Sequence, residues 1–186
     1  MENIPRDTIE RASNGDIGAF EEIYTSYSGF VYNVALRIVN NTSDAEEVTQ
    51  DVFMKIYKSL RNFRFESSFK TWVYRITANT AINTYKKISK ESKHRGDYDI
   101  ALKTHAADDK TEECFKKEEN EKLLGYLLDK LSIKQRSCIV LREVEGLSYE
   151  EISKVLGINI NTVRSRIKRA RLALLAYGKE VVGYEL

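Results

Sequence analysis

The stretch LSYEEISKVLGININTVRSRIKRARLAL, residues 147–174, decides the fold class of this chain. Its apolar residues recur at spacings of three and four, which is typical of amphipathic α-helices. Ser148 and Glu151 form the capping-box pattern that begins a helix, and Gly157 can adopt the left-handed conformation that ends one. Asn159 is then a suitable N-cap for a second helix. The stretch therefore predicts two helices joined by a short glycine turn.

The second of these helices combines a narrow apolar stripe with many cations. At 100° per residue, its apolar residues fall within about 60° of one another; they are Val163, Ile167, Ala170 and Leu174. The other positions give our candidate DNA-binding residues: Asn161, Thr162, Arg164, Ser165, Arg166, Lys168, Arg169 and Arg171. A charge run alone would suit a solvated helix face. The caps, the turn and the stripe together favour a helix-turn-helix, whose second helix enters the major groove.

Charge alternates in blocks along the 186 residues, although the whole chain carries a net charge of only +2. Residues 1–60 and 104–151 are net acidic, whereas residues 61–103 and 152–186 are net basic. Two separate basic blocks indicate two contacts with a polyanion, and the acidic blocks leave room for a different partner.

The rest of the chain also predicts helices, since the whole sequence contains only one proline and nine glycines and shows little strand-like alternation. An apolar helix face runs from Phe20 to Ile38, a capping box at Ser43 and Glu46 begins the next helix, and a third long helix follows from about Ser68. We therefore predict an all-α protein.

The apolar pattern fails between about residues 88 and 111, where the sequence is polar and mixed in charge. Such composition indicates a flexible linker. We predict two small helical domains, residues 1–90 and 112–186, joined by a linker at residues 91–111, with the helix-turn-helix in the second domain.

The helix DAEEVTQDVFMKIYKSL, residues 44–60, has a core face opposite a face that carries acids, an amide and a methionine. An ordinary solvated face would explain this pattern, but the same groups also suit docking to a protein. The candidate docking residues are Asp44, Glu47, Gln50, Asp51 and Met54.

The next segment, residues 61–87, interleaves aromatic residues with cations. Helical spacing places Phe69, Trp72 and Ile76 toward the core. The short loop at residues 63–68 lacks helical order, and its mixture of rings, cations and hydroxyls suits unstacked bases. The candidate residues for this second contact are Phe63, Arg64, Phe65, Ser67, Ser68, Trp72, Arg75, Asn79 and Asn83.

Other classes of protein fit the sequence poorly. The chain has only two cysteines, far apart in sequence, and two histidines, His94 and His105. These residues are too few and too widely spaced to indicate a zinc site or a disulfide framework. No apolar run reaches the ~20 residues that span a bilayer, and the N-terminus has no apolar signal core. We expect a cytoplasmic protein that does not insert into membranes and binds neither cofactor nor metal.

An enzyme built on a carboxylate-bridged metal bundle is one alternative, using Glu46, Glu47 and Asp51. Such sites require Glu-x-x-His pairs, and both histidines lie in the predicted linker. A phosphate-binding glycine loop and a nucleophile motif are also missing from the sequence. We therefore expect no enzymatic activity.

Three segments in order resemble the extracytoplasmic-function sigma factors of bacterial RNA polymerase: DAEEVTQDVFMKIYKSL, NFRFESSFKTWVYRITANTAIN and LSYEEISKVLGININTVRSRIKRARLAL. The resemblance covers nearly all of the chain outside the linker and the first dozen residues. It implies a two-domain helical protein that binds core polymerase and directs it to promoters, in a stress or envelope response.

The resemblance also implies a role for each surface. The docking residues would bind the beta-prime clamp helices of core polymerase, and the C-terminal domain would rest on the beta flap. Residues 63–68 and the helix after them, with Asn79 prominent, would melt the downstream promoter element and hold a flipped base. The basic helix would read the upstream element. Relatives are commonly held inactive by an anti-sigma protein, often membrane-anchored.

Two positions depart from the family pattern. Ser132 stands where many relatives have proline, and a serine can still cap a helix. Asn83 stands where several relatives carry an acid, which leaves the downstream base preference open.

A conventional helix-turn-helix regulator is the main alternative, and it predicts a stable dimer on a palindromic site. The sequence has no dimerisation heptad, and this alternative leaves residues 63–83 unexplained.

Overall fold

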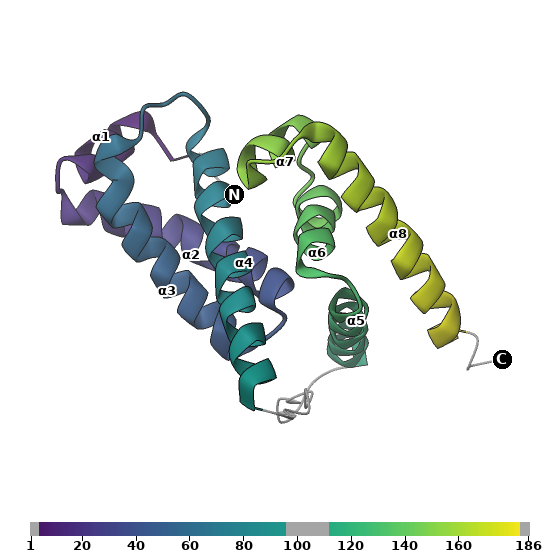
Figure 1. Ribbon diagram of the computed structural model, residues 1–186. Helices are drawn as coiled ribbons and strands as arrows, with labels where there is room; N and C mark the ends of the chain where they lie inside the picture. The colour runs from purple at the N-terminus through teal and green to yellow at the C-terminus, as the bar shows by residue number, and fades with distance from the viewer. Residues whose placement is uncertain (1–3, 96–111, 183–186) are drawn as a thin grey trace.

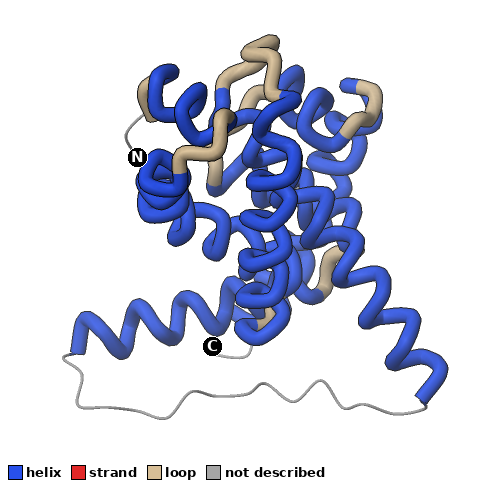
Figure 2. The backbone as a smooth tube through the Cα atoms, turned by 90° about the vertical axis from the view of Figure 1, so that its left-hand side faces the viewer, coloured by secondary structure: helices blue, strands red, loops and turns tan. Residues whose placement is uncertain are grey.

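The computed structural model describes residues 4–95 and 112–182, with side chains described for residues 4–91 and 121–178. All regular structure in the described part is helical (Figures 1 and 2). The N-terminal domain contains α1 (Arg6–Ser13), α2 (Ile17–Val39), α3 (Thr42–Ser59), the short 3₁₀ turn η1 (Leu60–Asn62) and α4 (Phe69–Arg95). The C-terminal domain contains α5 (Glu112–Asp129), α6 (Ile133–Ile139), the π-helical turn η2 (Val140–Val144), α7 (Tyr149–Leu156) and α8 (Ile160–Val182). The predicted all-α class is confirmed.

The structure differs from the sequence prediction at the end of α4. This helix continues to Arg95, beyond Ile88, where the apolar pattern stops. Residues 69–95 contain neither glycine nor proline, so nothing in the local sequence breaks the helix once the core contacts end. The rest of the predicted linker, residues 96–111, lies outside the described residues.

Most of the predicted helix starts are confirmed, but Ser43 is not a cap. Asn41 takes that role, since its side-chain oxygen accepts a hydrogen bond from the Asp44 amide at 3.0 Å. The preceding Asn40 ends α2 in the left-handed conformation, with φ of 56°. Two adjacent asparagines therefore end one helix and begin the next, leaving no room for a cap at Ser43.

Helix α1 was not predicted, because its eight residues are mostly polar. It is held by a few buried groups, Thr8, Ile9 and Ala12, which pack mainly against α2. The core of the N-terminal domain lies between α2, α3 and α4, and includes Ile23, Val34, Val48, Ile56 and Val73, all fully buried.

The two domains pack directly against each other, mainly through α4 with α7 and α6 (Figure 1). Arg136 of α6 is completely buried at this interface. Its Nη1 donates to the carbonyl of Ile38 at 3.1 Å, its Nη2 lies 2.8 Å from a carboxylate oxygen of Asp129, and its guanidinium lies 5.3 Å from the Tyr85 ring centre.

Three further hydrogen bonds join the domains. The Tyr74 hydroxyl donates to Glu145 at 2.9 Å, and burial, followed by the charge of Glu145, raises the pKa of Tyr74. The Asn40 amide donates to Asp129 at 2.6 Å and to the Gly125 carbonyl at 3.1 Å. The contact between the domains therefore includes polar groups beside the apolar core that both domains share.

We predict that Arg136→Ala loosens this contact. Losing the buried guanidinium leaves a cavity and an unpaired carbonyl, which should lower the free energy of unfolding by about 2–3 kcal/mol. Small-angle scattering should show a larger radius of gyration. Arg142→Ala is the matched control, because Arg142 also binds a carbonyl (Leu147, 2.8 Å) and a tyrosine ring (Tyr149, 5.1 Å), but inside one domain. An unchanged radius in Arg136→Ala would contradict this role.

The capping box of α7 gives a pH-dependent prediction. The Ser148 amide donates to Glu151 at 2.8 Å, and the Glu151 amide donates to the Ser148 hydroxyl at 3.1 Å. The hydrogen bond from the Ser148 backbone holds the pKa of Glu151 below its usual value. This group therefore stabilises the fold above the ordinary glutamate pKa, and the contribution is lost as pH falls through the lowered pKa.

Thermal melts of the parent and Glu151→Gln across a pH series should measure that contribution. The parent should melt at a higher temperature at neutral pH, and the difference should disappear in acid. Glu150→Gln is the control, since Glu150 is exposed and makes no hydrogen bond within the described residues. A difference between parent and Glu151→Gln that is constant with pH would contradict the prediction.

Candidate nucleic-acid interface

Helices α7 and α8 form the predicted helix-turn-helix. Gly157 ends α7 with φ of 62°, and the Asn159 side chain accepts the Asn161 amide at 2.8 Å at the start of α8. The stripe on α8 is buried as expected: Val163, Ile167 and Ala170 are at most 1% exposed. Leu174 is half-buried. Helix α8 therefore docks through a thin apolar stripe onto α6 and α7.

The structure separates the polar residues of α8 into two groups. Asn161, Arg164, Ser165, Lys168 and Arg169 are exposed. Lys168 and Arg169 form no ion pair or hydrogen bond with any described residue, and Arg164 donates to the Asn161 side chain at 3.2 Å. These five residues form an outward polar arc.

Arg166 and Arg171 have partners in the C-terminal domain. Arg171 donates through Nη2 and Nε to Glu143 at 2.6 and 3.1 Å. Arg166 is half-buried and lies against the thiol of Cys138, where its charge opposes the rise in the pKa of that thiol caused by burial. Thr162 is also half-buried. Glu143 and Cys138, the partners of Arg171 and Arg166, lie outside the basic helix, so the periodicity of that helix could not predict these contacts.

Helix α3 presents the predicted docking face. Ala45, Val48, Val52 and Ile56 are fully buried, whereas Glu47, Gln50, Asp51 and Met54 are exposed on the other side. Asp44 is half-buried, and burial together with the nearby charge of Glu47 raises its pKa. The face therefore carries its acids on the turns before Met54, which is 56% exposed, and an exposed lysine, Lys58, on the turn after it.

Tyr57, which the sequence analysis did not select, continues this face. It is 55% exposed and lies three positions beyond Met54, on the same side of the helix. Its ring packs edge-on against Phe20 of α2, with centroids 5.1 Å apart. The spacing from Met54 was a signal that could have identified it. The exposed surface of α3 thus combines acids and apolar groups, with Lys55 and Lys58 near its C-terminal end.

The loop at residues 63–68 holds a cluster of aromatic rings. Phe63 lies 4.7 Å from Phe65, 5.1 Å from Trp72 and 5.5 Å from Phe69, measured between ring centroids. Phe63, Phe65 and Trp72 are half-buried, and Phe69 is buried. The rings therefore pack on one another rather than standing free in solvent. In the same loop Arg64 and Ser67 are exposed, and Ser68 caps α4 by accepting the Thr71 amide at 3.0 Å.

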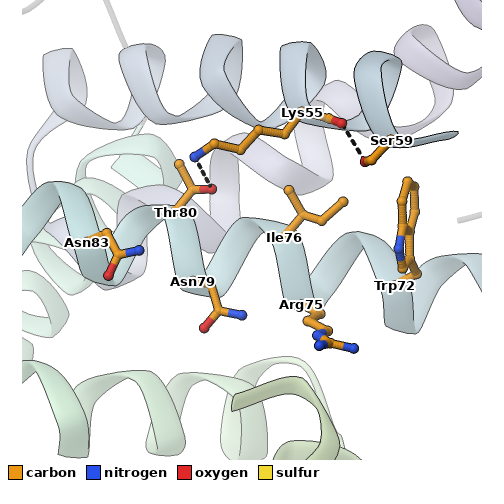
Figure 3. Close-up of a pocket in the computed structure, with 8 residues that line it drawn as sticks. All are labelled: Lys55, Ser59, Trp72, Arg75, Ile76, Asn79, Thr80 and Asn83. Atoms are coloured by element: carbon orange, nitrogen blue, oxygen red, sulfur yellow. Dashed lines mark hydrogen bonds between the residues drawn. The ribbon is translucent and has the colours of Figure 1, made fainter. Parts of the chain in front are cut away.

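A pocket of about 270 Å³ lies beside this cluster, between α3 and α4 (Figure 3). It brings together four of the predicted residues, Trp72, Arg75, Asn79 and Asn83. Its other lining residues are Lys55, Ser59, Ile76 and Thr80, of which Lys55 donates to the Thr80 hydroxyl at 3.0 Å. Lys55 and Ser59 were missed because they come from α3, and no local pattern links them to α4.

The pocket has the groups that hold an unstacked base. The Trp72 ring offers a stacking surface, the amides of Asn79 and Asn83 offer donors and acceptors, and Arg75 offers a cation. Arg75, Asn79 and Asn83 are exposed. Figure 3 shows them along the open side of α4.

The part of the chain that the structure describes lacks two other kinds of site. No group of three histidine, cysteine or acidic side chains there could hold a metal ion. Among the same residues, no helix is both long and apolar enough to cross a bilayer.

The family models and the similar proteins all point to one family. Residues 23–91 match the model "Sigma-70 region 2", and residues 121–174 match "Sigma-70, region 4". The chain is 35% identical over 175 residues to the RNA polymerase sigma-H factor of Pseudomonas aeruginosa, covering 89% of each chain. It is 36% identical over 171 residues to the ECF RNA polymerase sigma-E factor of Haemophilus influenzae, covering 88% of this chain and 89% of that one.

A solved structure shares the fold. The sigma factor RpoE of Bartonella quintana, in complex with the anti-sigma factor NepR, superimposes with a TM-score of 0.63 and 25% identity, covering 88% of this chain and 96% of that one. One family model matches the domain that carries the pocket, and the other matches the domain that carries the helix-turn-helix. Neither family model describes an enzyme. The chain belongs to the extracytoplasmic-function sigma factors, the non-enzymatic transcription initiation factors of bacterial RNA polymerase.

Proposed function

We propose that this chain binds core RNA polymerase through α3 and contacts promoter DNA at two separate places, the pocket beside Trp72 and the outward polar arc of α8. The observation that carries the proposal is the pocket. It joins an aromatic ring, two amides and a cation in the domain that does not contain the helix-turn-helix. A conventional helix-turn-helix regulator has no use for such a pocket.

The downstream promoter element is the proposed ligand of the pocket. A base that leaves the duplex can stack on Trp72 and present its edge to the amides of Asn79 and Asn83. Arg64, Ser67 and Arg75 are exposed and lie close to Trp72 in the sequence. They can contact the phosphates of the separated strand.

The upstream promoter element is the proposed ligand of α8. Lys168 and Arg169 are exposed cations without partners among the described residues. They can therefore bind phosphates without first breaking an ion pair. Arg164, Asn161 and Ser165 lie nearer the N-terminal end of the helix, where side chains of a recognition helix contact base edges. Arg171 must first leave Glu143 to contribute.

Core polymerase is the proposed partner of two surfaces. The face of α3 that carries Asp51 and Met54 is the proposed contact for the beta-prime clamp helices, because acids beside an exposed apolar side chain suit a protein surface with cations around an apolar centre. An apolar groove of about 420 Å³ in the C-terminal domain suits the beta flap. Its lining includes Leu124, Leu128, Val144, Leu174 and Leu175, of which Val144 is 44% and Leu175 is 63% exposed.

An anti-sigma protein, often membrane-anchored in this family, is a further proposed partner. The complex of RpoE with NepR supports it, as do the exposed apolar residues of this chain, which such a protein would cover. We further propose that the chain acts in the cytoplasm, where core polymerase and DNA are found.

Reconstituted transcription tests the proposed function. Purified chain and sigma-free core polymerase are incubated with a pool of genomic upstream fragments, and transcripts are sequenced. Discrete start sites that need the chain support the proposal. If the chain binds neither core polymerase nor any promoter in its presence, but binds duplex DNA as a dimer, the conventional regulator is correct instead.

For the docking face, we predict that Asp51→Lys weakens binding to core polymerase at least tenfold, because it places a cation where the partner is expected to be cationic. Asp51 is exposed and has no partner among the described residues, so folding should change little. Glu46→Lys is the matched control, with the same charge change on the same helix outside the docking residues. Equal core affinity for Asp51→Lys and the parent would rule out this face.

For α8, we predict that Lys168→Ala lowers the salt dependence of promoter binding by the holoenzyme by about one ion, as expected for one lost phosphate contact. Arg171→Ala should have a smaller effect, because its guanidinium already pairs with Glu143. Lys134→Ala, on the exposed start of α6, is the control. Binding measured across a salt series gives each slope; a larger effect for Arg171→Ala than for Lys168→Ala would contradict the assignment.

A further inference from the structure

Helix α1 contacts the loop between α3 and α4 at two points. Near its C-terminal end, the Ser13 carbonyl accepts a hydrogen bond from Arg61 Nε at 3.2 Å. At its first residue, the guanidinium carbon of Arg6 lies 4.4 Å from the centre of the Phe65 ring. Figure 1 shows α1 beside this loop.

Phe65 has an unusual backbone conformation. Its φ is +56°, in the left-handed region that aromatic residues seldom adopt. Such a conformation persists only where surrounding contacts stabilise it, and it is concentrated at functional sites. Phe65 is partly buried against the core, and its ring also lies 4.4 Å from the Arg6 guanidinium carbon and 4.7 Å from the centre of the Phe63 ring.

The Phe65 ring is linked to the pocket through two more rings. Phe63 lies between Phe65 and Trp72, and its centroid is 5.1 Å from that of Trp72. Trp72 in turn lines the pocket with Asn79. The Phe63 ring therefore connects Phe65 to Trp72 by direct contact on both sides.

We propose that Arg6 is a positioning residue for the base-binding pocket: by stacking on Phe65 it keeps the loop in its left-handed conformation and so sets the position of Trp72. The proposal rests on the proposed function of the pocket in promoter melting. Arg6 acts through Phe65 and Phe63, since it does not line the pocket itself.

The surroundings of Arg6 support a positioning role over a purely structural one. Its side chain is 72% exposed, so it contributes little to the core. Its Nε donates to Glu10 one turn along α1 at 2.7 Å, which fixes the guanidinium in front of the Phe65 ring. A cation over an aromatic face is attracted by the electrons of the ring.

Arg11 supplies a matched control on the same helix. It is also exposed and forms ion pairs with Asp7, Asp16 and Glu22 at 3.1, 3.1 and 3.3 Å. It makes no aromatic contact among the described residues. Arg11→Ala therefore removes an arginine of α1 and more ion pairs, but leaves the Phe65 ring in place.

The test uses Trp72 as a probe, because it is the only tryptophan in the chain. Acrylamide quenching of its fluorescence is measured for the full chain and for Arg6→Ala, Arg6→Lys and Arg11→Ala. The same four proteins are then assembled with core polymerase, and open promoter complexes are measured by permanganate reactivity. Circular dichroism melts check that each variant is folded.

Arg6→Ala should increase quenching of Trp72 and reduce open complexes about two- to fivefold, matching the loss of one exposed cation–ring contact. Arg6→Lys keeps a cation and should recover part of both signals, whereas Arg11→Ala should match the parent. Parent-like quenching and open complexes for Arg6→Ala, or equal losses in Arg11→Ala, would overturn the inference. A parent that opens no promoter contradicts the proposed function itself.

Discussion

Helix α4 is packed along two sides and open along the third, and this asymmetry determines where the other features of the molecule can lie. One side, with Val73 and Thr77, is fully buried in the core of the N-terminal domain. A second side contacts the C-terminal domain, through the Tyr74 hydrogen bond to Glu145 and the Tyr85 ring beside Arg136. Only the third side, with Arg75, Asn79 and Asn83, is left to line a pocket. Because both packed sides hold the helix, the pocket side chains are displayed from a fixed backbone.

Part of the interface between the domains is polar. A buried arginine, an asparagine amide and a tyrosine hydroxyl make hydrogen bonds there that water can replace, so separating these groups costs less than exposing an equal area of apolar core. Interfaces between domains of one chain are commonly of this kind. Two DNA contacts on separate domains gain affinity from each other only when their spacing matches the DNA. If the interface between the domains opens, the distance between the two DNA-contacting surfaces is set by the partner that binds both domains.

The sequence predicts features that depend on local patterns. The caps at Ser148 and Asn159, the turn at Gly157 and the apolar stripe of α8 follow from residue types at fixed spacings, and all are found in the structure. Features that depend on residues distant in sequence were not predictable. The ion pair of Arg171 with Glu143 and the contribution of Lys55 to the pocket arise from packing between helices, which no periodicity encodes.

Helix α1 shows the same limit in another form. Its eight residues are mostly polar and only three of them are buried, so the sequence offers too few apolar positions to predict a helix there. Yet its two ends contact the loop that carries Phe65. A left-handed φ at an aromatic residue is unfavourable in any isolated loop, so contacts from outside the loop must hold it. Contacts of this kind come from Arg6 of α1, from the Phe63 ring and from the core against which Phe65 packs. The conformation of the loop is therefore a property of three segments together, and a helix that adds little to the core still determines the shape of a pocket wall.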